Sequence, residues 1–287
     1  MARKLIVPAL SLALLGALLF VLAAALFCHV TLAKHPKSAS TPAGVVTVVV
    51  RARDGASLSA WWLQPSKPNG NCVAVLHGIA DSRSSARGFA PMFLNEGYSV
   101  LLPDSRAHGA SGGEFVTYGL LEKYDAIAWA TWMKKAGCHK LYALGESLGA
   151  SILIQSAGVQ PVFSAIVAEC PYADLREVAE YRVRQMAHVP KFVARIVVGS
   201  SLIYADWVDG LDLHHVSPVE SIAHASTPIL LIHGLRDSRT PPWNSERLAH
   251  ADPHAVLWLV PNADHTGASS AEPTEFRRRV LGWFAEH

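Results

Sequence analysis

The sequence predicts an α/β fold with a mostly parallel eight-stranded sheet, an antiparallel hairpin at its start and helices on both faces. Short apolar runs alternate with segments whose apolar residues follow helical spacing, which favours parallel strands joined by right-handed crossovers. Asp54-Gly55 separates the first two runs and is typical of a hairpin turn. A third signal is the Gly-x-Ser-x-Gly pattern at residues 145–149, which lies between a strand and a helix.

The predicted elements follow one another with short connections. The strands are expected at residues 45–53, 58–64, 72–76, 98–102, 141–144, 162–168, 228–232 and 255–260. Helices are expected at residues 87–96, 120–135, 150–157 and 272–284, with two more at 175–188 and 191–205. Because no strand-like run occurs between the sixth and seventh strands, we predict a helical cap at about residues 171–217. The apolar side of its second helix packs on the core, contacts the acyl part of a substrate, or does both.

The N-terminal segment differs from the rest of the chain. Residues 5–33 contain no Asp, Glu, Lys or Arg. A helix over residues 9–27 would reach about 28 Å, enough to cross a hydrocarbon core. This run is longer than the apolar part of most signal peptides, of about 7–15 residues. We therefore predict a transmembrane anchor, or alternatively a signal sequence, at residues 1–34, a linker at 35–44 and one globular domain at 45–287.

Charge and sequons bear on partners and location. The formal net charge of +2 is nearly neutral and forms no basic stripe, so we expect no nucleic-acid partner. No asparagine begins an N-x-Ser/Thr sequon, which fits a bacterial protein or a cytosol-facing domain. Lysine and arginine are nearly balanced across the apolar segment, so its orientation is weakly specified. The layout is similar to a single-pass signal anchor whose catalytic domain lies outside the cytosol, in the periplasm if the protein is bacterial.

Five motifs lie at residues 77–81, 104–112, 145–149, 233–237 and 263–265. Together they carry a family resemblance that runs from about residue 45 to the C-terminus. The chain resembles serine-nucleophile α/β-hydrolases, in particular the membrane-anchored branch that is similar to monoglyceride lipases and serine aminopeptidases. Ala107 stands where the family usually has glycine, which leaves the catalytic assignment unaffected. The resemblance also places Cys72 and Cys138 at the N-terminal ends of two adjacent strands, where they could form a disulfide or remain two buried thiols.

Three residues are the candidates for nucleophilic catalysis. A serine hydroxyl needs a base to remove its proton, and a histidine oriented by a carboxylate is such a base. In this fold they occur in the order serine, acid, histidine. Ser147, Asp237 and His265 have that order, and the last two follow separate strands. Glu169, with Asp174 behind it, is the competing acid.

Among the fourteen histidines, only His265 follows both the acid and the last strand in a polar loop. His77 and His233 end strands just before glycine and are expected to brace loops. His250 and His254 are four residues apart, but Pro253 between them argues against a helical metal site. We therefore predict neither a metal nor a cofactor. In the loop at 104–112 we expect Asp104 and Arg106 to pair.

The oxyanion of a tetrahedral intermediate requires two preorganised donors. We predict the backbone N–H groups of Leu148, directly after the nucleophile, and of Ile79, in the loop after the third strand. These features predict a serine hydrolase of the carboxylesterase, lipase or thioesterase type, acting on a small-molecule or lipid acyl ester. One alternative is an aminopeptidase-like serine peptidase, in which Glu177 and Glu180 of the cap would hold an amine. The other is a non-catalytic binding protein with the same fold.

Overall fold

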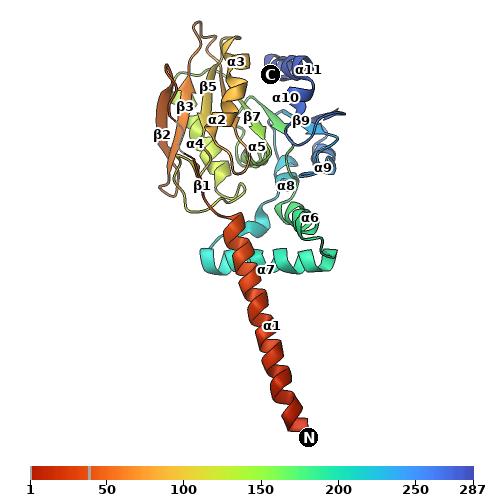
Figure 1. Cartoon of the computed structure of the whole chain (residues 1–287). Coiled ribbons are helices and arrows are strands. Elements are labelled where there is room, and N and C mark those ends of the chain that lie inside the picture. Colours follow the sequence, from red (N-terminus) through yellow and green to blue (C-terminus); the bar gives the residue numbers. More distant parts are fainter. Residues whose placement is uncertain (1, 38–39) are drawn as a thin grey trace.

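The computed structural model describes residues 2–37 and 40–287, with side chains of the first helix from residue 15 onward except 17 and 19. An eight-stranded sheet forms the centre of the molecule (Figure 1), in the order β10-β9-β8-β7-β4-β5-β3-β2. Strand β3 is antiparallel to both neighbours and the other pairs are parallel, which confirms the predicted hairpin and mostly parallel sheet. The strands are β2 (Val46–Arg51), β3 (Ser57–Leu63), β4 (Cys72–Leu76), β5 (Ser99–Pro103), β7 (Leu141–Glu146), β8 (Ala165–Glu169), β9 (Ile229–Gly234) and β10 (Val256–Val260).

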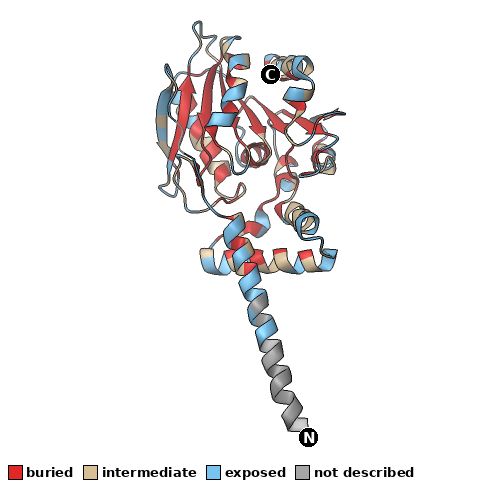
Figure 2. Cartoon of the chain, in the orientation of Figure 1, coloured by how far each residue is buried: buried red, intermediate tan, exposed pale blue. Residues whose placement is uncertain are grey.

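The sheet is buried on both faces because its strands alternate between two cores. In β4, Val73 and Val75 face one core, whereas Ala74 and Leu76 face the other. The first core is closed by α2 (Arg83–Ala86), α3 (Ala90–Leu94) and α11 (Pro273–Glu286). The second is closed by α4 (Glu122–Lys135), α5 (Leu148–Val159), α8 (Pro218–Ile222) and α9 (Trp243–Ala251). Figure 2 shows the buried sheet between these helices.

The strand order reverses between β4 and β7. The chain runs from β4 outward to β5 and then returns to form β7 on the other side of β4. In open parallel sheets such a reversal leaves a crevice at the carboxyl ends of the two strands, which is the usual place for a ligand. The serine motif follows β7 and the predicted oxyanion loop follows β4, so both lie at this crevice.

The region between β8 and β9 is helical, as predicted. It contains α6 (Leu175–Ala187), α7 (Lys191–Asp209), the 3-10 turn η2 (Leu213–His215) and α8. The Asp174 side chain caps α6 by accepting from the Glu177 N–H at 3.0 Å, and α7 ends at Gly210 with φ 66°. Asp174, one of the competing acids, therefore has a structural role at a helix terminus. The boundaries of a separate cap remain a prediction.

Two local predictions were wrong. The helix expected at residues 87–96 is instead a 3-10 turn, η1 (Arg87–Phe89), followed by the short α3, because Gly88 and Pro91 interrupt a continuous helix; α2 precedes it. Asp104 and Arg106 do not pair with each other. Asp104 accepts from the backbone of Arg83 and Ala110, at 2.7 and 2.8 Å.

The buried Arg106 guanidinium instead binds Asp125 through two hydrogen bonds of 2.7 Å, and it contacts Asp54 at 2.7 Å. A bidentate carboxylate on α4 satisfies more of its donors than a neighbour in the same loop could. The structure also contains the Cys72–Cys138 disulfide, with the Cα atoms 5.8 Å apart.

The N-terminal helix α1 (Ala2–Thr31) projects from one end of the domain (Figure 1). Among the described residues, none of the helices combines the length and apolar character needed to cross a membrane. The first part of the predicted span, residues 9–14, lies outside the residues whose side chains are described. The predicted linker at residues 35–44 begins with a short strand, β1 (His35–Pro36), which pairs with β6 (His108–Gly109) of the domain. Residues 38–39 of the linker are not described.

Candidate active site

Ser147 occupies a strained turn between β7 and α5. Its backbone angles, φ 51° and ψ −110°, are rarely adopted by residues other than glycine. The flanking glycines allow this turn, because a Cβ on Gly145 would collide with the Gly149 backbone and one on Gly149 with the Leu76 carbonyl oxygen. The Ser147 N–H donates to the Glu169 carbonyl at 2.8 Å, which fixes the turn to the neighbouring strand. The result is a serine held above the strand ends, at the start of a helix.

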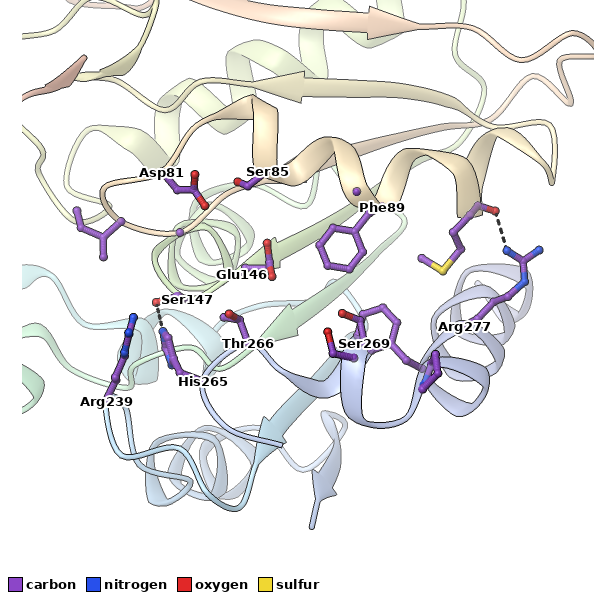
Figure 3. A pocket seen from close by; sticks show the side chains of 17 residues that line it. Asp81, Ser85, Phe89, Glu146, Ser147, Arg239, His265, Thr266, Ser269 and Arg277 are labelled. Atoms are coloured by element: carbon purple, nitrogen blue, oxygen red, sulfur yellow. Dashed lines mark hydrogen bonds between the residues drawn. The ribbon is translucent and has the colours of Figure 1, made fainter. Parts of the chain in front are cut away.

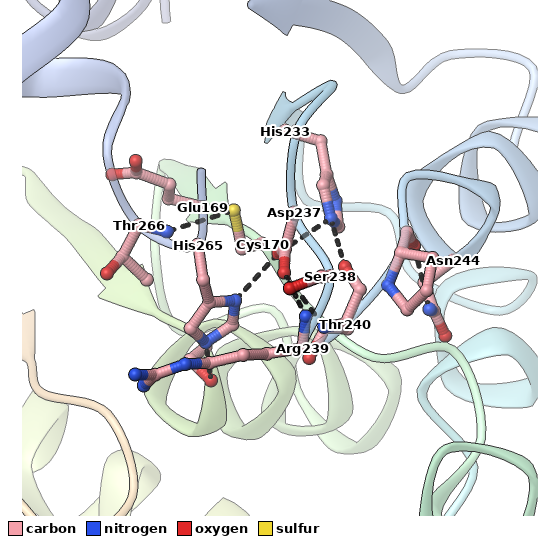
Figure 4. A network of polar contacts seen from close by, with 12 residues as sticks. Glu169, Cys170, His233, Asp237, Ser238, Arg239, Thr240, Asn244, His265 and Thr266 are labelled. Atoms are coloured by element: carbon pink, nitrogen blue, oxygen red, sulfur yellow. Dashed lines mark hydrogen bonds and ion pairs between the residues drawn. The ribbon is translucent and has the colours of Figure 1, made fainter. Parts of the chain in front are cut away.

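The structure brings Ser147, His265 and Asp237 together, as the sequence predicted. The distance from the Ser147 Oγ to the His265 Nε2 is 2.9 Å, and from the His265 Nδ1 to the Asp237 Oδ2 it is 2.7 Å (Figures 3 and 4). His265 follows β10 and Asp237 follows β9, so the three side chains come from three strand ends. This continuous hydrogen-bonded series could move a proton away from the serine.

Asp237 is buried among hydrogen-bond donors. Its Oδ1 accepts from the backbone N–H groups of Arg239 and Thr240, at 2.8 and 2.9 Å. Its Oδ2 accepts from His265 and lies 3.2 Å from the Nε2 of His233. Burial alone would raise the pKa of Asp237, but the hydrogen bonds from His233 and His265 hold that pKa well below its usual range. Asp237 is therefore charged at neutral pH.

Comparison with known proteins places the chain in a family. The family model of the prolyl oligopeptidase family matches residues 85–287, which is most of the domain. The chain belongs to the prolyl oligopeptidase family. Together with esterase and lipase relatives, this match confirms the resemblance to serine-nucleophile α/β-hydrolases.

Two sequence relatives and one solved structure match most of the length of this member of the prolyl oligopeptidase family. An uncharacterised protein of Mycobacterium tuberculosis is 31% identical over 79% of the chain and 74% of the relative. The lysophosphatidylserine lipase ABHD12 of Danio rerio is 27% identical over 66% of the chain, and the match spans 49% of that lipase. Among solved structures, an esterase of Pyrococcus furiosus is 26% identical with a TM-score of 0.68, over 84% of this chain and 92% of that one. The chain is thus similar to hydrolases that act on esters.

The loop after β4 lies against the serine. Gly78 is so close that a Cβ there would lie 3.5 Å from the Ser147 Cβ. His77 braces the loop by accepting from the Ser105 N–H at 3.1 Å, and His108 accepts from the Ala80 N–H at 3.2 Å. Burial lowers the pKa of both histidines to about 4, so their rings are neutral and can accept these bonds.

The two predicted oxyanion donors, Ile79 and Leu148, are on the segments that meet at Ser147. Leu148 is the first residue of α5, where a backbone N–H has no partner within the helix. Within the described part of the chain, neither the Ile79 nor the Leu148 N–H has an acceptor. Both are therefore free to bind an oxygen of a substrate.

A cavity of about 660 Å³ opens at Ser147 and His265. It continues past Glu146 and Phe89 toward Arg277, between the α2–α3 segment and the α10–α11 segment (Figure 3), with α10 at Ala268–Ala271. Its apolar wall suits a hydrocarbon group, whereas its carboxyl and guanidinium groups suit polar ends of a ligand. The apolar lining comes from Ile79, Phe89, Met92, Pro273 and Phe276.

Glu146 is a feature of this cavity that sequence reasoning missed. It pairs with Glu169 in the register of β7 and β8, so two carboxyl groups occupy neighbouring strand ends. Burial, followed by the charges of Glu169 and Asp81, raises the pKa of Glu146 to about 8. Burial likewise raises the pKa of Glu169 to about 7. The hydrogen bond that its Oε1 accepts from the Ala268 N–H, at 2.9 Å, acts in the opposite direction and lowers this pKa. The only sequence signal was a glutamate inside the serine motif.

The alternative site residues have other partners. Glu169 contacts Ala268, and its described contacts do not include His265. Glu177 forms an ion pair with Arg247, and Glu180 forms ion pairs with Arg176 and Arg195, at 3.2 and 3.6 Å. These cap glutamates are therefore engaged with arginines.

One group of described residues has metal-ligand spacing. Potential ligand atoms of Cys170, Asp237 and His265 lie within 4.8 Å of one another. Burial raises the pKa of the Cys170 thiol well above its ordinary value, which favours the neutral form, whereas metals bind the thiolate. The Cys170 Sγ accepts instead from the Thr266 N–H at 3.3 Å, which holds the loop that carries His265 (Figure 4).

Proposed function

We propose that this protein hydrolyses acyl esters through an acyl-enzyme intermediate on Ser147. The observation that carries the proposal is the series of hydrogen bonds from the Ser147 Oγ to His265 at 2.9 Å and from His265 to Asp237 at 2.7 Å. A serine in a strained turn, with a histidine and a carboxylate at these distances, is the arrangement that nucleophilic catalysis requires.

In the first half of the reaction, the Ser147 Oγ attacks the ester carbonyl carbon while the His265 Nε2 takes the hydroxyl proton. Charged Asp237 accepts from the Nδ1–H, which orients the ring and stabilises the imidazolium. The N–H groups of Ile79 and Leu148 bind the oxyanion. His265 then donates its proton to the leaving alkoxide oxygen, and the acyl group remains on Ser147.

In the second half, a water molecule attacks the acyl carbon while His265 removes one of its protons. The tetrahedral intermediate forms again and collapses as the Ser147 Oγ leaves and is protonated by His265. The products are a carboxylic acid and an alcohol. The cycle requires only groups of this chain and water, so we propose no cofactor.

Ester chemistry is supported by relatives and by the cavity. The Pyrococcus furiosus protein is described as an esterase, and the Danio rerio relative as a lysophosphatidylserine lipase. The apolar wall of Phe89, Met92 and Phe276 suits an acyl chain that extends from Ser147. We therefore propose an acyl ester of a lipid or a small molecule as the substrate class.

Peptide hydrolysis is the second candidate, because the family is named for a peptidase. The cap glutamates support it poorly, since arginines neutralise them. A substrate amine would find carboxyl groups inside the cavity instead, at Asp81 and Glu146. Asp81 is partly neutralised by Lys37 at 3.4 Å, and Glu146 holds its proton at neutral pH. We therefore rank the ester above the peptide.

The experiment is a substrate panel on the full chain. Purified wild type is assayed with p-nitrophenyl esters of increasing acyl length and with aminoacyl p-nitroanilides, and Ser147→Ala is the matched control. We expect ester turnover that disappears in Ser147→Ala, and anilide turnover that is lower by a factor of at least about 100 in kcat/KM, or about 2.7 kcal/mol. Faster anilide turnover would establish the peptidase, and no turnover of either class would reject the hydrolase.

We further propose that residues 1–34 attach the protein to a membrane with the catalytic domain outside the cytosol. Support comes from the charge-free residues 5–33 and from the exposed apolar side chains of α1, for example Leu22 and Leu26. The Cys72–Cys138 disulfide supports an oxidising compartment.

A further inference from the structure

Helix α7 has apolar residues on two opposite faces. Its buried face packs against α1, α6 and the rest of the domain, through Ala194, Val198, Ser201, Leu202 and Ala205. The other face carries four exposed large apolar side chains. At 100° per residue they fall within an arc of about 60°, on the side opposite the buried face. They are Phe192, Ile196, Ile203 and Trp207.

The exposure of this face is high. Trp207 is 86% exposed and Phe192 is 64% exposed. Large apolar side chains that gather on one exposed face mark a binding surface more often than scattered ones do. Near α7, Met186 at the end of α6 is also exposed. A solvated helix would carry polar residues at these positions, so something apolar is expected to cover the face.

The position of α7 indicates what covers it. Figure 1 shows α7 crosswise to α1, at the end of the domain from which α1 projects. The two helices are in direct contact, since the Ser201 Oγ donates to the Ala24 carbonyl at 3.1 Å and the His29 and Tyr204 rings lie 5.9 Å apart. Beyond this crossing, α1 continues away from the domain with its apolar side chains exposed, among them Leu15 and Leu18. The outer face of α7 therefore points to the side on which the apolar α1 extends.

The charge of the same segment is one-sided. Residues 181–205, from the middle of α6 through most of α7, contain four arginines or lysines and no aspartate or glutamate, whereas the last turn of α7 carries Asp206 and Asp209. The positive charge is therefore concentrated around the connection between α6 and α7. Arg184 and Lys191 are exposed, and so is Arg195, which also forms an ion pair with Glu180 at 3.6 Å. Basic side chains beside an apolar helix face match a surface of anionic lipids, which attracts each cation by about 1 kcal/mol.

We propose that α7 lies in the plane of a membrane surface and docks the domain onto anionic lipids. Phe192, Ile196, Ile203 and Trp207 enter the boundary between head groups and acyl chains, while α1 runs deeper into the same bilayer. This inference does not depend on the proposed hydrolysis. It adds a second, in-plane contact to the proposed N-terminal attachment and fixes how the domain faces the lipid.

Docking through α7 also reaches the active site through α6. Tyr181 and Gln185 of α6 donate to the Ser238 carbonyl, at 3.3 and 2.7 Å. Ser238 follows Asp237, so the helix that packs on α7 also holds the loop of the proposed catalytic acid. The lipid surface is thereby connected to the active site by one helix.

The test uses tryptophan fluorescence of the full chain bound to vesicles of phosphatidylglycerol and phosphatidylcholine. A fraction of the lipid carries bromine near the top of the acyl chain, where it quenches tryptophans at that depth. We expect the wild type to be quenched and Trp207→Phe to lose at least half of that quenching. Trp283→Phe is the matched control, because α11 lies at the opposite end of the domain (Figure 1). In this variant the brominated lipid should quench the same fraction of the tryptophan fluorescence as in the wild type.

A second variant separates docking from α1. The triple variant Phe192→Ser, Ile196→Ser and Ile203→Ser keeps Trp207 as the reporter. It should abolish the quenching of Trp207 and leave turnover of soluble p-nitrophenyl acetate and the circular dichroism spectrum unchanged. Quenching that is equal in the wild type and Trp207→Phe would overturn the proposal. A dimer that covers this face would also overturn it. In that case sedimentation would show a wild-type dimer that the serine variant converts to a monomer, and vesicles would leave Trp207 of the wild type unquenched.

Discussion

Two acidic sites flank Ser147, and they differ in the number of donors that face each carboxyl group. Asp237, after β9, accepts two backbone N–H groups and a hydrogen bond from His265, with His233 at 3.2 Å. Glu169, at the end of β8, accepts one N–H with Oε1, and its Oε2 has no hydrogen-bond partner within the described chain. Both sites are buried, so burial alone cannot explain why the pKa of Asp237 is lowered whereas the pKa of Glu169 is raised.

The comparison shows that donors decide which carboxyl group stays charged. Asp237 keeps its charge at neutral pH and can stabilise a histidine cation. Glu146 holds its proton at neutral pH because burial raises its pKa to about 8, and burial raises the pKa of Glu169 to about 7, so that this group is about half-protonated there. A neutral Glu146 suits a cavity in which an oxyanion forms, since a second negative charge there would oppose that intermediate.

The largest expected effect comes from removing the charge at the donor-rich site. Asp237→Asn should lower kcat/KM for the best ester by about 10⁴-fold, because the amide cannot hold the histidine tautomer that accepts the serine proton. Steady-state assays on folded protein measure this loss. Glu169→Gln is the matched control for the competing acid and should change kcat/KM by less than about tenfold. A larger loss in Glu169→Gln than in Asp237→Asn would assign the acid to β8.

A smaller effect is expected at the donor-poor site, on stability. The pKa of Glu146 rises on folding from 4.5 to about 8, so the folded state binds this proton more tightly than the unfolded state. Its contribution to stability is therefore complete below pH 4.5 and is lost as the pH rises toward 8. Glu146→Gln has no proton to lose, so its stability should not fall in this range. The free energy of unfolding of the variant minus that of the wild type should therefore be larger at pH 8 than at pH 5, by on the order of 2 kcal/mol.

Urea unfolding at the two pH values measures the difference. Glu114→Gln, at an exposed glutamate, is the control and should follow the wild type at both. If Glu146→Gln differed from the wild type by the same amount at pH 5 and pH 8, Glu146 would not hold a proton in the folded state, and the contrast with Asp237 would fail.

The sequence predicted the parts of this architecture that depend on local pattern. Apolar runs gave the eight strands, and Asp54-Gly55 gave the hairpin. The three side chains at the proposed active site could be chosen because strand ends of a parallel sheet meet at one edge. Order along the chain admitted both Asp237 and the competing acid Glu169, and the structure brings Asp237 to His265.

Features that depend on packing between distant segments could not be predicted. The prediction that Arg106 pairs with Asp104 was wrong, because its bidentate acceptor, Asp125, lies on α4. The raised pKa of Glu146 depends first on its burial and then on its register with Glu169, and both require the tertiary arrangement of the strands. The outer apolar face of α7 was assigned to core or substrate contacts, since its spacing resembles a packed helix and the position of α1 is a tertiary property.

The central claim is that Ser147 is the nucleophile, and covalent labelling tests it most directly. The folded full chain is treated with a fluorophosphonate, which phosphonylates activated serines, and the adduct is located by mass spectrometry of the digested protein. The account predicts one adduct per chain, on the peptide that contains Ser147, and none in Ser147→Ala or His265→Ala. Folded wild type that forms no adduct, or that carries it on another serine, would contradict the account.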